Sequence, residues 1–398
     1  MLETTESVVS LKKKHLKQQA VRTVYAQGSI TISSLARILR ISIPSATTIV
    51  QELITEQWVQ EIGAQNSKFG RKPILFDLNG EKQSILVIDI GIHQTSIHRV
   101  DLRNRIEKII HFPLAINDSE FVAKLSLELK KATVFLQPIW GVCLTSPGLI
   151  ANETQENQTY LNHQISGNSL TKKIQELSGK PTFIINDTKA SLLGETHFGL
   201  AKNKRNVMLL NLDWGIGLGI LSNGEIMQGT DGFAGEIGHI QVVPGGRLCH
   251  CGKIGCLETV ASVASLLGRA QEGLKIDAPT VLRKNQELTI EAIIEAANQG
   301  DEFSIELIYE LGRELGKGLS IAIHLLNPEL IIIDGLLTNT GANLTTAIEQ
   351  SINKFCLRDF KKALRVLISP MGETAKLVGA KQFVFDQLIQ TEFQDTMN

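Results

Sequence analysis

The stretch that decides the fold is Gly229–Ser262, which reads GTDGFAGEIGHIQVVPGGRLCHCGKIGCLETVAS. Within it, His239 is followed by three closely spaced cysteines, Cys249, Cys251 and Cys256. Three thiolates and one imidazole nitrogen form a closed tetrahedral donor set for zinc. Glycines between and around the cysteines allow so short a loop to fold back around an ion. We therefore predict a structural Zn²⁺ held by these four residues.

The remaining cysteine content supports metal over disulfides. The chain has five cysteines in 398 residues, too few and too clustered to cross-link a protein of this size. Two alternatives stay open: free thiols in a glycine-rich turn, and His250 as a rival ligand, although its place between two ligating cysteines makes it awkward. The first twenty residues lack a signal-peptide pattern, and no apolar run approaches the ~20 residues that span a bilayer. We expect a soluble cytoplasmic protein without a membrane partner.

Charge is distributed unevenly along the chain. Residues 1–80 carry ten Lys/Arg against six Asp/Glu, a difference of +4, whereas the remainder carries thirty against thirty-five, a difference of −5. Excess positive charge is the expected footprint of a region that contacts phosphates. A basic face exposed to water is the alternative. With 43% hydrophobic and 20% charged residues, the whole chain is long enough for two or three globular units.

The N-terminal residues show the pattern of three short helices. Apolar residues recur at helical spacing over 12–27 and 32–39, and Ser42 can cap a third helix with Pro44 in its first turn. In that third helix Ala46, Ile49, Val50, Leu53 and Ile54 share one face, which we expect to be buried. Short polar side chains on the opposite face suit a recognition helix that reaches base edges. The predicted DNA-contacting residues of this helix are Ser42, Ser45, Thr47, Thr48 and Gln51.

A β-hairpin with a basic loop follows the helices. Two strand-like runs, 58–62 and 74–78, flank a polar segment that ends in Gly70-Arg71-Lys72-Pro73. We predict a wing in which Arg71 and Lys72 contact phosphates or the minor groove, so that residues 1–80 form a winged helix-turn-helix DNA-binding domain. The alternative is a three-helix interaction module with an incidental basic loop.

After residue 80 strands alternate with helices, which indicates an α/β body. The expected strands are 85–90, 95–101, 109–114, 139–144, 182–185, 207–212, 217–221 and 330–333, and the expected helices are 120–135, 170–177, 260–271 and 301–326.

The segment Gly229–Ser262 closely resembles the signature of the ROK family of repressors and sugar kinases, and the winged N-terminus resembles that of the family's repressors. The resemblance implies a two-lobed, actin-like (ribonuclease H-like) sugar-kinase body with a structural zinc loop. The implied first lobe covers residues 81–190, completed by 372–398. The second lobe, with the zinc loop, sugar site and dimerisation elements, covers 191–371.

The same resemblance implies a set of sugar-binding residues. Glu236, His239 and Glu258 would bind sugar hydroxyls, and His239 could touch the sugar with one ring nitrogen while the other ligates zinc. The pair Asn186-Asp187 would also bind sugar; in the family's kinases this aspartate is the general base, and here it would be vestigial. Gly148 and Asn168 are carried over from a weaker alignment. The alternatives are zinc-loop scaffolding for Glu236 and Glu258, and a helix cap or turn for Asn186-Asp187.

Three phosphate or nucleotide elements depart from the pattern of an active kinase. The first phosphate hairpin, Asp89–His93, has an imidazole where the family has a small hydroxyl. The second loop has Asp213-Trp214 where a G-T-G-like turn approaches the nucleotide, and the C-terminal nucleotide segment reads Ile333-Asp334-Gly335-Leu336-Leu337. Added negative charge and bulk beside an anionic ligand predict that ATP does not bind and that the protein is not an enzyme.

The sequence therefore predicts a sugar-responsive DNA-binding regulator of carbohydrate-metabolism genes, with the repressor sense taken from the resemblance. The expected partners are operator DNA, a sugar or sugar derivative, and a second copy of the chain, as a homodimer or a dimer of dimers. Two alternatives remain: an active ATP-dependent sugar kinase for a hexose or amino sugar, and a regulator controlled by a sugar-transport protein.

Overall fold

The computed structural model describes residues 8–64, 73–133, 138–160, 169–284 and 287–393. They divide into two compact units, each presented by itself below. Unit 1 comprises residues 1–145, 160–184 and 380–398, and unit 2 comprises residues 146–159 and 185–379. The domain boundaries expected after residues 80, 190 and 371 stay a prediction. Among the described residues, no helix combines the length and the apolar character needed to cross a bilayer.

Unit 1 begins with three helices, α1 (Val8–Gln27), α2 (Ile32–Leu39) and α3 (Ile43–Thr55). The predicted cap of α3 is confirmed, because the Ser42 hydroxyl accepts a hydrogen bond from Ser45 N at 3.3 Å and Pro44 lies in the first turn. Four of the five residues expected on its inner face are buried. Ile54 is the exception at 38% exposure, because successive residues of a helix point in different directions and Ile54 lies at the edge of the face that contains the buried Leu53.

A small antiparallel sheet follows these helices, with strand order β1 (Ile30–Thr31), β3 (Ile74–Leu78), β2 (Val59–Ala64). The hairpin β2–β3 that the sequence predicts is present, and an irregularity between Glu61 and Gly63 shifts its register. The loop tip, with Arg71 and Lys72, lies outside the described residues.

The last helix, α13 (Glu373–Glu392), packs against the first helix of the chain. Tyr25 of α1 stacks on Phe385 with ring centroids 4.1 Å apart, and the Lys381 ammonium donates a hydrogen bond to the Tyr25 hydroxyl. Arg22 Nη1 lies 3.2 Å from Asp386 Oδ1. The N-terminal helices therefore take part of their core from the C-terminal end of the chain.

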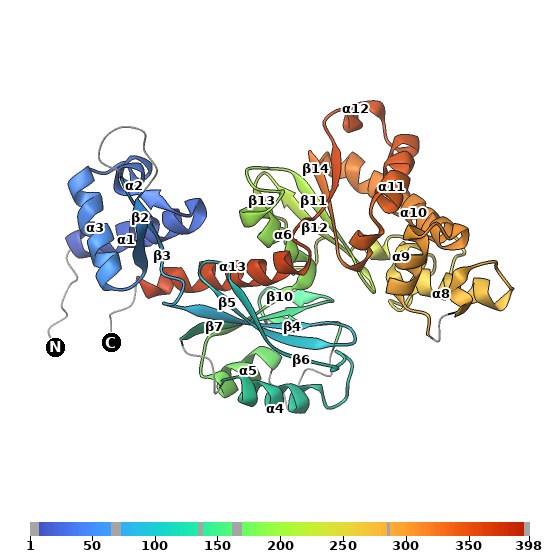
Figure 1. The fold of residues 1–398 in the computed structure, drawn as a ribbon, viewed down its shortest axis with the longest axis horizontal. Coiled ribbons are helices and arrows are strands. Elements are labelled where there is room, and N and C mark those ends of the chain that lie inside the picture. Colours follow the sequence, from blue (N-terminus) through green and yellow to red (C-terminus); the bar gives the residue numbers. More distant parts are fainter. Residues whose placement is uncertain (1–7, 65–72, 134–137, 161–168, 285–286, 394–398) are drawn as a thin grey trace. The chain divides into compact units, whose positions relative to one another are not determined.

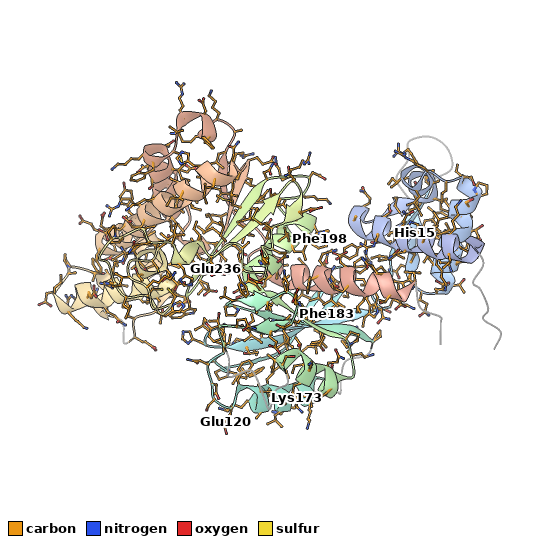
Figure 2. The ribbon with its side chains drawn as sticks, turned by 180° about the vertical axis from the view of Figure 1, so that it is seen from behind. His15, Glu120, Lys173, Phe183, Phe198 and Glu236 are labelled. Carbon is orange, nitrogen blue, oxygen red and sulfur yellow. The ribbon has the colours of Figure 1, made fainter. Side chains whose placement is uncertain are left out.

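The five-stranded sheet of unit 1 has the order β10 (Thr182–Asn186), β7 (Ile139–Ser146), β4 (Ser84–Ile90), β5 (Thr95–Asp101), β6 (Ile106–Phe112). Helices α4 (Phe121–Thr133) and α5 (Leu170–Ser178) cover one face, and α13 runs along the other (Figure 1). Phe183 of β10, labelled in Figure 2, meets Phe383 of α13 edge to face at 6.3 Å.

Unit 2 contains a second sheet with the same pattern of strand order: β13 (Glu225–Ile226), β12 (Ile216–Ser222), β11 (Val207–Leu212), β14 (Leu330–Asp334), β15 (Arg365–Ile368). In both sheets an antiparallel meander of three strands is extended by strands beside its first member. A short pair, β8 (Ile150–Ala151) and β9 (Glu156–Asn157), completes the strands described. The α/β body expected from the sequence is thus confirmed.

Alternate residues of β11 and β14 enter two different cores, as the two-residue period of a strand requires. Val207, Leu209, Leu330 and Ile332 pack toward Leu192 of α6 (Asp187–Phe198). Their neighbours Met208, Leu210, Ile331 and Ile333 pack into a larger core with the other helices of this unit. Those helices are α7 (Glu258–Ala261), α8 (Val263–Lys275), α9 (Ile290–Asn298), α10 (Glu302–Leu326) and α11 (Ala342–Phe355), followed by the short α12 (Arg358–Lys361).

One helix expected from the sequence is divided in the structure. The segment 260–271 was predicted to be continuous, but Ser262 is extended, with φ −94° and ψ 168°, and separates α7 from α8. Its hydroxyl accepts a hydrogen bond from Ser265 N at 3.1 Å, so a capping side chain breaks the helical pattern and starts a new helix. Glu258 therefore belongs to a separate short helix, α7, and not to the first turn of α8.

Candidate functional site

The polar centre of unit 2 begins at the N-terminus of α6. Asn186 caps this helix, since its Oδ1 accepts a hydrogen bond from Lys189 N at 3.1 Å. Its Nδ2 donates to Gly148 O, also at 3.1 Å. Gly148 has φ +91°, a conformation that favours glycine, so this amide links the start of the helix to a turn after β7 that requires glycine. The helix-cap alternative for Asn186 is therefore true, and it is compatible with a ligand role for the neighbouring residue.

Asp187 is the first residue of α6 and is partly exposed. Its Oδ1 accepts hydrogen bonds from Thr188 N at 2.6 Å and from Thr188 Oγ1 at 3.2 Å. Asn211 Nδ2, near the end of β11, donates to the same Thr188 hydroxyl at 3.3 Å. The carboxylate is thus held by its own helix turn and lies beside the end of the central strand.

Lys189 ties this helix to the glycine-rich loop 228–236. The side chain is 7% exposed, and its ammonium donates hydrogen bonds to Gln228 Oε1 at 3.0 Å and to Gly232 O. On the far side of the loop, a Cβ on Gly235 would lie 1.9 Å from Leu218 O, so only glycine fits there. These contacts fix the position of the loop and thereby that of Glu236.

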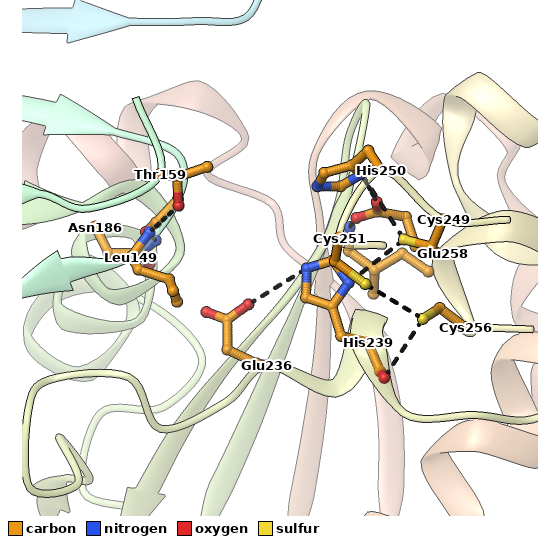
Figure 3. Close-up of polar contacts among 12 residues, drawn as sticks. Leu149, Thr159, Asn186, Glu236, His239, Cys249, His250, Cys251, Cys256 and Glu258 are labelled. Carbon is orange, nitrogen blue, oxygen red and sulfur yellow. Dashed lines mark hydrogen bonds and ion pairs between the residues drawn. The ribbon is translucent and has the colours of Figure 1, made fainter. Parts of the chain in front are cut away.

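Figure 3 shows Glu236, which is also labelled in Figure 2, between Asn186 at the N-terminus of α6 and His239 beside the cysteine-rich loop. Burial, together with the charges of Asp187 and Glu258, raises the pKa of Glu236 above its ordinary value, and the Lys189 ammonium opposes this shift. Burial in turn lowers the pKa of Lys189, against the opposing charge of Glu236. Glu236 is therefore influenced by two other carboxylates and by one buried ammonium group.

Each carboxylate oxygen of Glu258 has one polar partner. Oε2 accepts a hydrogen bond from Ile216 N at 3.2 Å, and Oε1 lies 2.9 Å from His250 Nδ1. A Cβ on Gly215 would approach Oε2 to 2.6 Å, so the turn before β12 needs a glycine to admit this side chain. Glu258 is 13% exposed and is held in one orientation.

The sulfur atoms of the cysteine-rich loop lie at distances that fit a metal ion. Cys251 Sγ and Cys256 Sγ are 3.7 Å apart, and Cys249 Sγ is 3.7 Å from His239 Nδ1. The four donor atoms all lie within 4.8 Å of one another. In a tetrahedron with zinc–sulfur bonds of about 2.3 Å, neighbouring sulfurs are about 3.8 Å apart. The donor set and its spacing are therefore compatible with zinc.

The two ring nitrogens of His239 face different groups (Figure 3). Nδ1 points to the sulfur cluster, whereas Nε2 lies 3.9 Å from Glu236 Oε2. Burial lowers the pKa of His239, although the charge of Glu258 opposes the shift, so the neutral imidazole that binds metals is favoured. Nδ1 thus lies beside the thiols and Nε2 beside Glu236, and a contact of His239 with a sugar stays a prediction.

The substituted side chains of the three expected phosphate or nucleotide elements have the following contacts and exposure. Asp213 Oδ1 accepts a hydrogen bond from Trp214 N at 2.7 Å, so the carboxylate occupies a backbone donor of its own turn. Asp334 is 4% exposed; burial raises its pKa, while hydrogen bonds from Gly335 N–H and Ser191 oppose the shift. In unit 1, Asp89 Oδ1 accepts from Thr145 Oγ1 at 2.6 Å, and His93 is exposed.

Most of the predicted ligand residues thus belong to one unit. The structure places Gly148, Asn186, Asp187, Glu236, His239 and Glu258 in unit 2, whereas Asn168 lies outside the described residues. The sequence reasoning missed Lys189, whose position one helical turn after a capping asparagine was the available signal. It also treated His250 only as a rival metal ligand, and the structure gives it a second contact, to Glu258.

The family model described as "ROK family" matches residues 85–387. The chain belongs to the ROK family. A ROK relative spanning both the N-terminal region and the body is the DNA-binding transcriptional dual regulator NagC of Escherichia coli K12, 30% identical over 92% of this chain and 91% of its own length. The resemblance stated from Gly229–Ser262 is therefore confirmed.

Two solved structures differ in how much of this chain they match. A ROK family transcriptional regulator, a homologue of the E. coli MLC protein, is 29% identical with a TM-score of 0.79 and covers 96% of this chain and 99% of its own. A ROK family glucokinase from Streptomyces griseus, in complex with glucose and AMPPNP, is 26% identical with a TM-score of 0.68. It covers 75% of this chain and 98% of its own. The glucokinase therefore matches only part of this chain, whereas the regulator matches almost all of it.

Proposed function

We propose that this ROK protein is a sugar-responsive, DNA-binding repressor of carbohydrate-metabolism genes whose kinase-derived body senses a sugar without phosphorylating it. The observation that carries the proposal is the convergence of Asn186, Asp187, Glu236, His239 and Glu258 in unit 2, next to a second phosphate loop altered by Asp213 and Trp214. The similarity to two regulators over more than nine tenths of the chain supports the DNA-binding half of the proposal.

The sugar would lie against carboxylates that are already oriented. Carboxylate oxygens accept hydrogen bonds from vicinal hydroxyls, and those of Glu258 are held by Ile216 N and His250. His239 Nε2 and Asp187 would add contacts from the zinc side and the helix side. Asn186 would act on the sugar through the Gly148 turn that it fixes.

Zinc would be held by His239 Nδ1 and the thiolates of Cys249, Cys251 and Cys256. A closed site with four protein ligands supplies structural rigidity, since it leaves no position for a catalytic water. Ligation through Nδ1 would fix the ring of His239, whose Nε2 faces Glu236 and would be directed toward the sugar.

The DNA-binding part would be residues 1–80 as a winged helix-turn-helix. The exposed face of α3 carries Ser42, Ser45, Thr48 and Gln51, with Thr47 partly exposed beside them. Arg71 and Lys72 would contact DNA from the wing. A homodimer or a dimer of dimers would place two such helices in successive major grooves. The sugar would regulate DNA binding by binding two conformations of the protein with unequal affinity.

Fluorescence anisotropy with labelled DNA from the protein's own promoter region tests this function. The full, zinc-supplemented chain should bind the DNA, and one sugar from a panel of hexoses, pentoses and amino sugars should release it. DNA binding that is indifferent to every sugar would instead favour control by a transport-system protein. Exposed apolar residues in the zinc loop, Leu248 at 73% and Ile254 at 49%, are what such a partner could contact.

The alternative activity is that of a sugar kinase, which Asp187 keeps open as a possible general base. It predicts sugar-dependent ATP turnover at saturating nucleotide. We expect none, because Asp213 occupies a backbone donor of the phosphate loop and Asp334 adds a buried carboxylate near the nucleotide segment. Turnover at a rate usual for kinases would refute the sensor assignment.

A further inference from the structure

We propose that Cys251 is an oxidation site, and that a peroxide joins it to Cys256 in a disulfide and thereby releases the zinc proposed for this loop. The inference goes beyond the proposed sugar and DNA binding, and it rests only on the proposed donor set of the cysteine-rich loop. Its basis is the difference in exposure between Cys251 and the other cysteines, together with the distance between two sulfur atoms.

The first step concerns access to the thiols. All five cysteines of the chain lie in its described parts, and among them Cys251 is the exposed one. The other four are buried, with exposed fractions of 8% or less. The oxidation of thiols follows their exposure, so an oxidant dissolved in water meets Cys251 first.

The second step concerns the place of Cys251 in the loop. Leu248 and Ile254 pair in an isolated antiparallel bridge, so the residues between them form a short hairpin with Cys251 near its tip. Other side chains of this hairpin also face water, since Leu248 is 73% exposed and the side chain of His250 is 66% exposed. A Cβ on Gly252 would meet nothing within 4 Å. A small oxidant can therefore reach the tip without a change in the core.

Cys256 supplies the second sulfur. It lies at the base of the loop, in an isolated bridge with Gln241, and its thiol donates to His239 O at 3.5 Å. Its Sγ is 3.7 Å from Cys251 Sγ (Figure 3). A disulfide holds its two sulfurs about 2.0 Å apart, so the exposed thiol would have to approach the buried one by about 1.7 Å.

Cys249, the third thiol of the loop, is the less suitable partner. Its Sγ faces two imidazole rings, at 3.7 Å from His239 Nδ1 and 3.8 Å from His250 Nδ1. A single residue separates it from Cys251, so a disulfide between these two would close a small ring that restricts the geometry of the bond. Four residues separate Cys251 from Cys256, which favours the disulfide between them.

The chemistry needs one peroxide and two thiolates. Cysteines that bind zinc are deprotonated, and the thiolate is the form that peroxides oxidise. The Cys251 thiolate attacks one oxygen of hydrogen peroxide, so that an S–O bond forms, the O–O bond breaks and hydroxide leaves. The Cys256 thiolate then attacks the resulting sulfenic acid at sulfur and expels a second hydroxide as the S–S bond forms. The two thiolates lose two electrons to the peroxide, and two protons from the solvent convert the hydroxides to water.

The disulfide removes two of the four donors. Cys249 and His239 remain, and a closed structural site needs four protein ligands, so the loop should lose the metal. The ring of His239 would then no longer be fixed through Nδ1, and its Nε2 lies 3.9 Å from Glu236 Oε2. Oxidation of the loop would therefore loosen a residue of the polar centre.

The test uses the full chain, loaded with zinc and then treated with hydrogen peroxide. A colorimetric chelator measures the released zinc, and mass spectrometry after alkylation of the remaining thiols maps the cysteines. We expect about one zinc released per chain together with a disulfide between Cys251 and Cys256. Cys251 should be oxidised about tenfold or more faster than Cys143 and Cys356. Dithiothreitol followed by added zinc should restore the metal.

Cys251→His supplies the variant, because an imidazole can replace a thiolate as a zinc ligand and is not converted to a disulfide. Relative to its own zinc content at the start, it should lose zinc to peroxide about tenfold or more slowly than the unaltered chain. Cys356→Ala, the matched control, removes a buried thiol elsewhere in unit 2 and should leave the rate of release unchanged. If Cys251→His binds no zinc, trapping of the sulfenic acid with dimedone on the unaltered chain identifies the sulfur that is oxidised first.

The possible failures are distinguishable. Oxidation that falls first on a buried cysteine would overturn the inference and leave the ligand set intact, and so would zinc that stays bound after Cys251 has been oxidised. Oxidation of Cys251 without a bond to Cys256 would do the same. A chain that holds no zinc before treatment would instead refute the ligand set itself, and the release of zinc with it.

Discussion

The ammonium of Lys381 donates a hydrogen bond to the hydroxyl of Tyr25, across a separation of 356 residues in the chain. Lys381 is fully buried, and its Nζ also lies 4.3 Å from the centre of the Tyr25 ring. Burial lowers the pKa of Lys381 to about 7, although the charges of Asp101 and Asp386 oppose the shift. A titratable pair therefore joins the first helix of the N-terminal region to the last helix of the chain.

This pair makes stability depend on pH. The folded-state pKa of Lys381 lies below its ordinary value, so between pH 7 and about 10 the unfolded chain binds a proton that the folded chain does not. The free energy of unfolding should consequently rise by about 3 kcal/mol from pH 7 to pH 10, and lie at its lowest below pH 7. Urea titrations across this range measure it.

Lys381→Met should flatten that pH dependence, since methionine keeps the apolar stem and removes the charge. Lys275→Met, at an exposed lysine at the end of α8, is the matched control and should preserve the slope. An unchanged slope in Lys381→Met would show that another group is responsible.

Removing one predicted zinc ligand should release the metal. Cys251→Ser replaces a soft thiolate with a hydroxyl that binds zinc poorly, so the metal content should fall from about one zinc per chain toward zero. Cys356→Ala removes a thiol elsewhere in unit 2, buried against α10 at 8% exposure, and should keep the zinc. Elemental analysis of the purified proteins decides between these outcomes, and full retention of zinc in Cys251→Ser would refute the ligand set.

Gly215→Ala should weaken sugar binding without replacing any of the proposed sugar-binding residues. Its Cβ would lie 2.6 Å from Glu258 Oε2, so the glutamate would have to leave the orientation held by Ile216 N. We expect about a tenfold loss of affinity in calorimetry. Gly268→Ala, whose Cβ would meet nothing closer than 4.0 Å, is the control. Equal affinities in the two variants would contradict the role of Glu258.

Substitutions on α3 and in the wing should affect DNA binding in different ways. Thr48 is exposed, and its hydroxyl donates to Pro44 O at 3.1 Å, which fixes the direction of its methyl group. Thr48→Ala should change base preference by about 1 kcal/mol at one position of the operator. Arg71→Ala or Lys72→Ala should instead lower affinity on all sequences and reduce the slope of log affinity against log salt by about 1 each. A binding-site selection and a salt series distinguish these effects.

The sequence predicted helices and strands well where nearby apolar and capping side chains determine their bounds. Helix α2 and the strands β3, β5 and β11 have the expected bounds, because apolar spacing and capping residues act within a few positions. Helices α6, α9, α11 and α13 were missed as elements. The pattern of α6 is obscured because buried polar residues, Lys189 and Glu195 among them, replace the usual apolar stripe.

The cysteine-rich loop was predicted because its donors are close in sequence, and their spacing in the structure suits a metal. The role of Lys189 could not be derived, since its partners Gln228 and Gly232 lie 39 and 43 residues away and depend on the fold of the glycine-rich loop. In the same way, no local sequence pattern predicts that position 215 needs a glycine to accommodate the side chain of Glu258, 43 residues later.

The packing of α1 on α13 bears on the order of events during synthesis. The ribosome makes α1 before α13, and domains generally fold as their segments emerge. Here α2, α3 and β3 can cover part of α1 early, but the part around Tyr25 stays uncovered until Lys381 and Phe385 have been translated. The packing of the N-terminal region would therefore be complete only after α13 has been made, so a product that ends before α13 would lack part of the core that supports the proposed DNA-binding region.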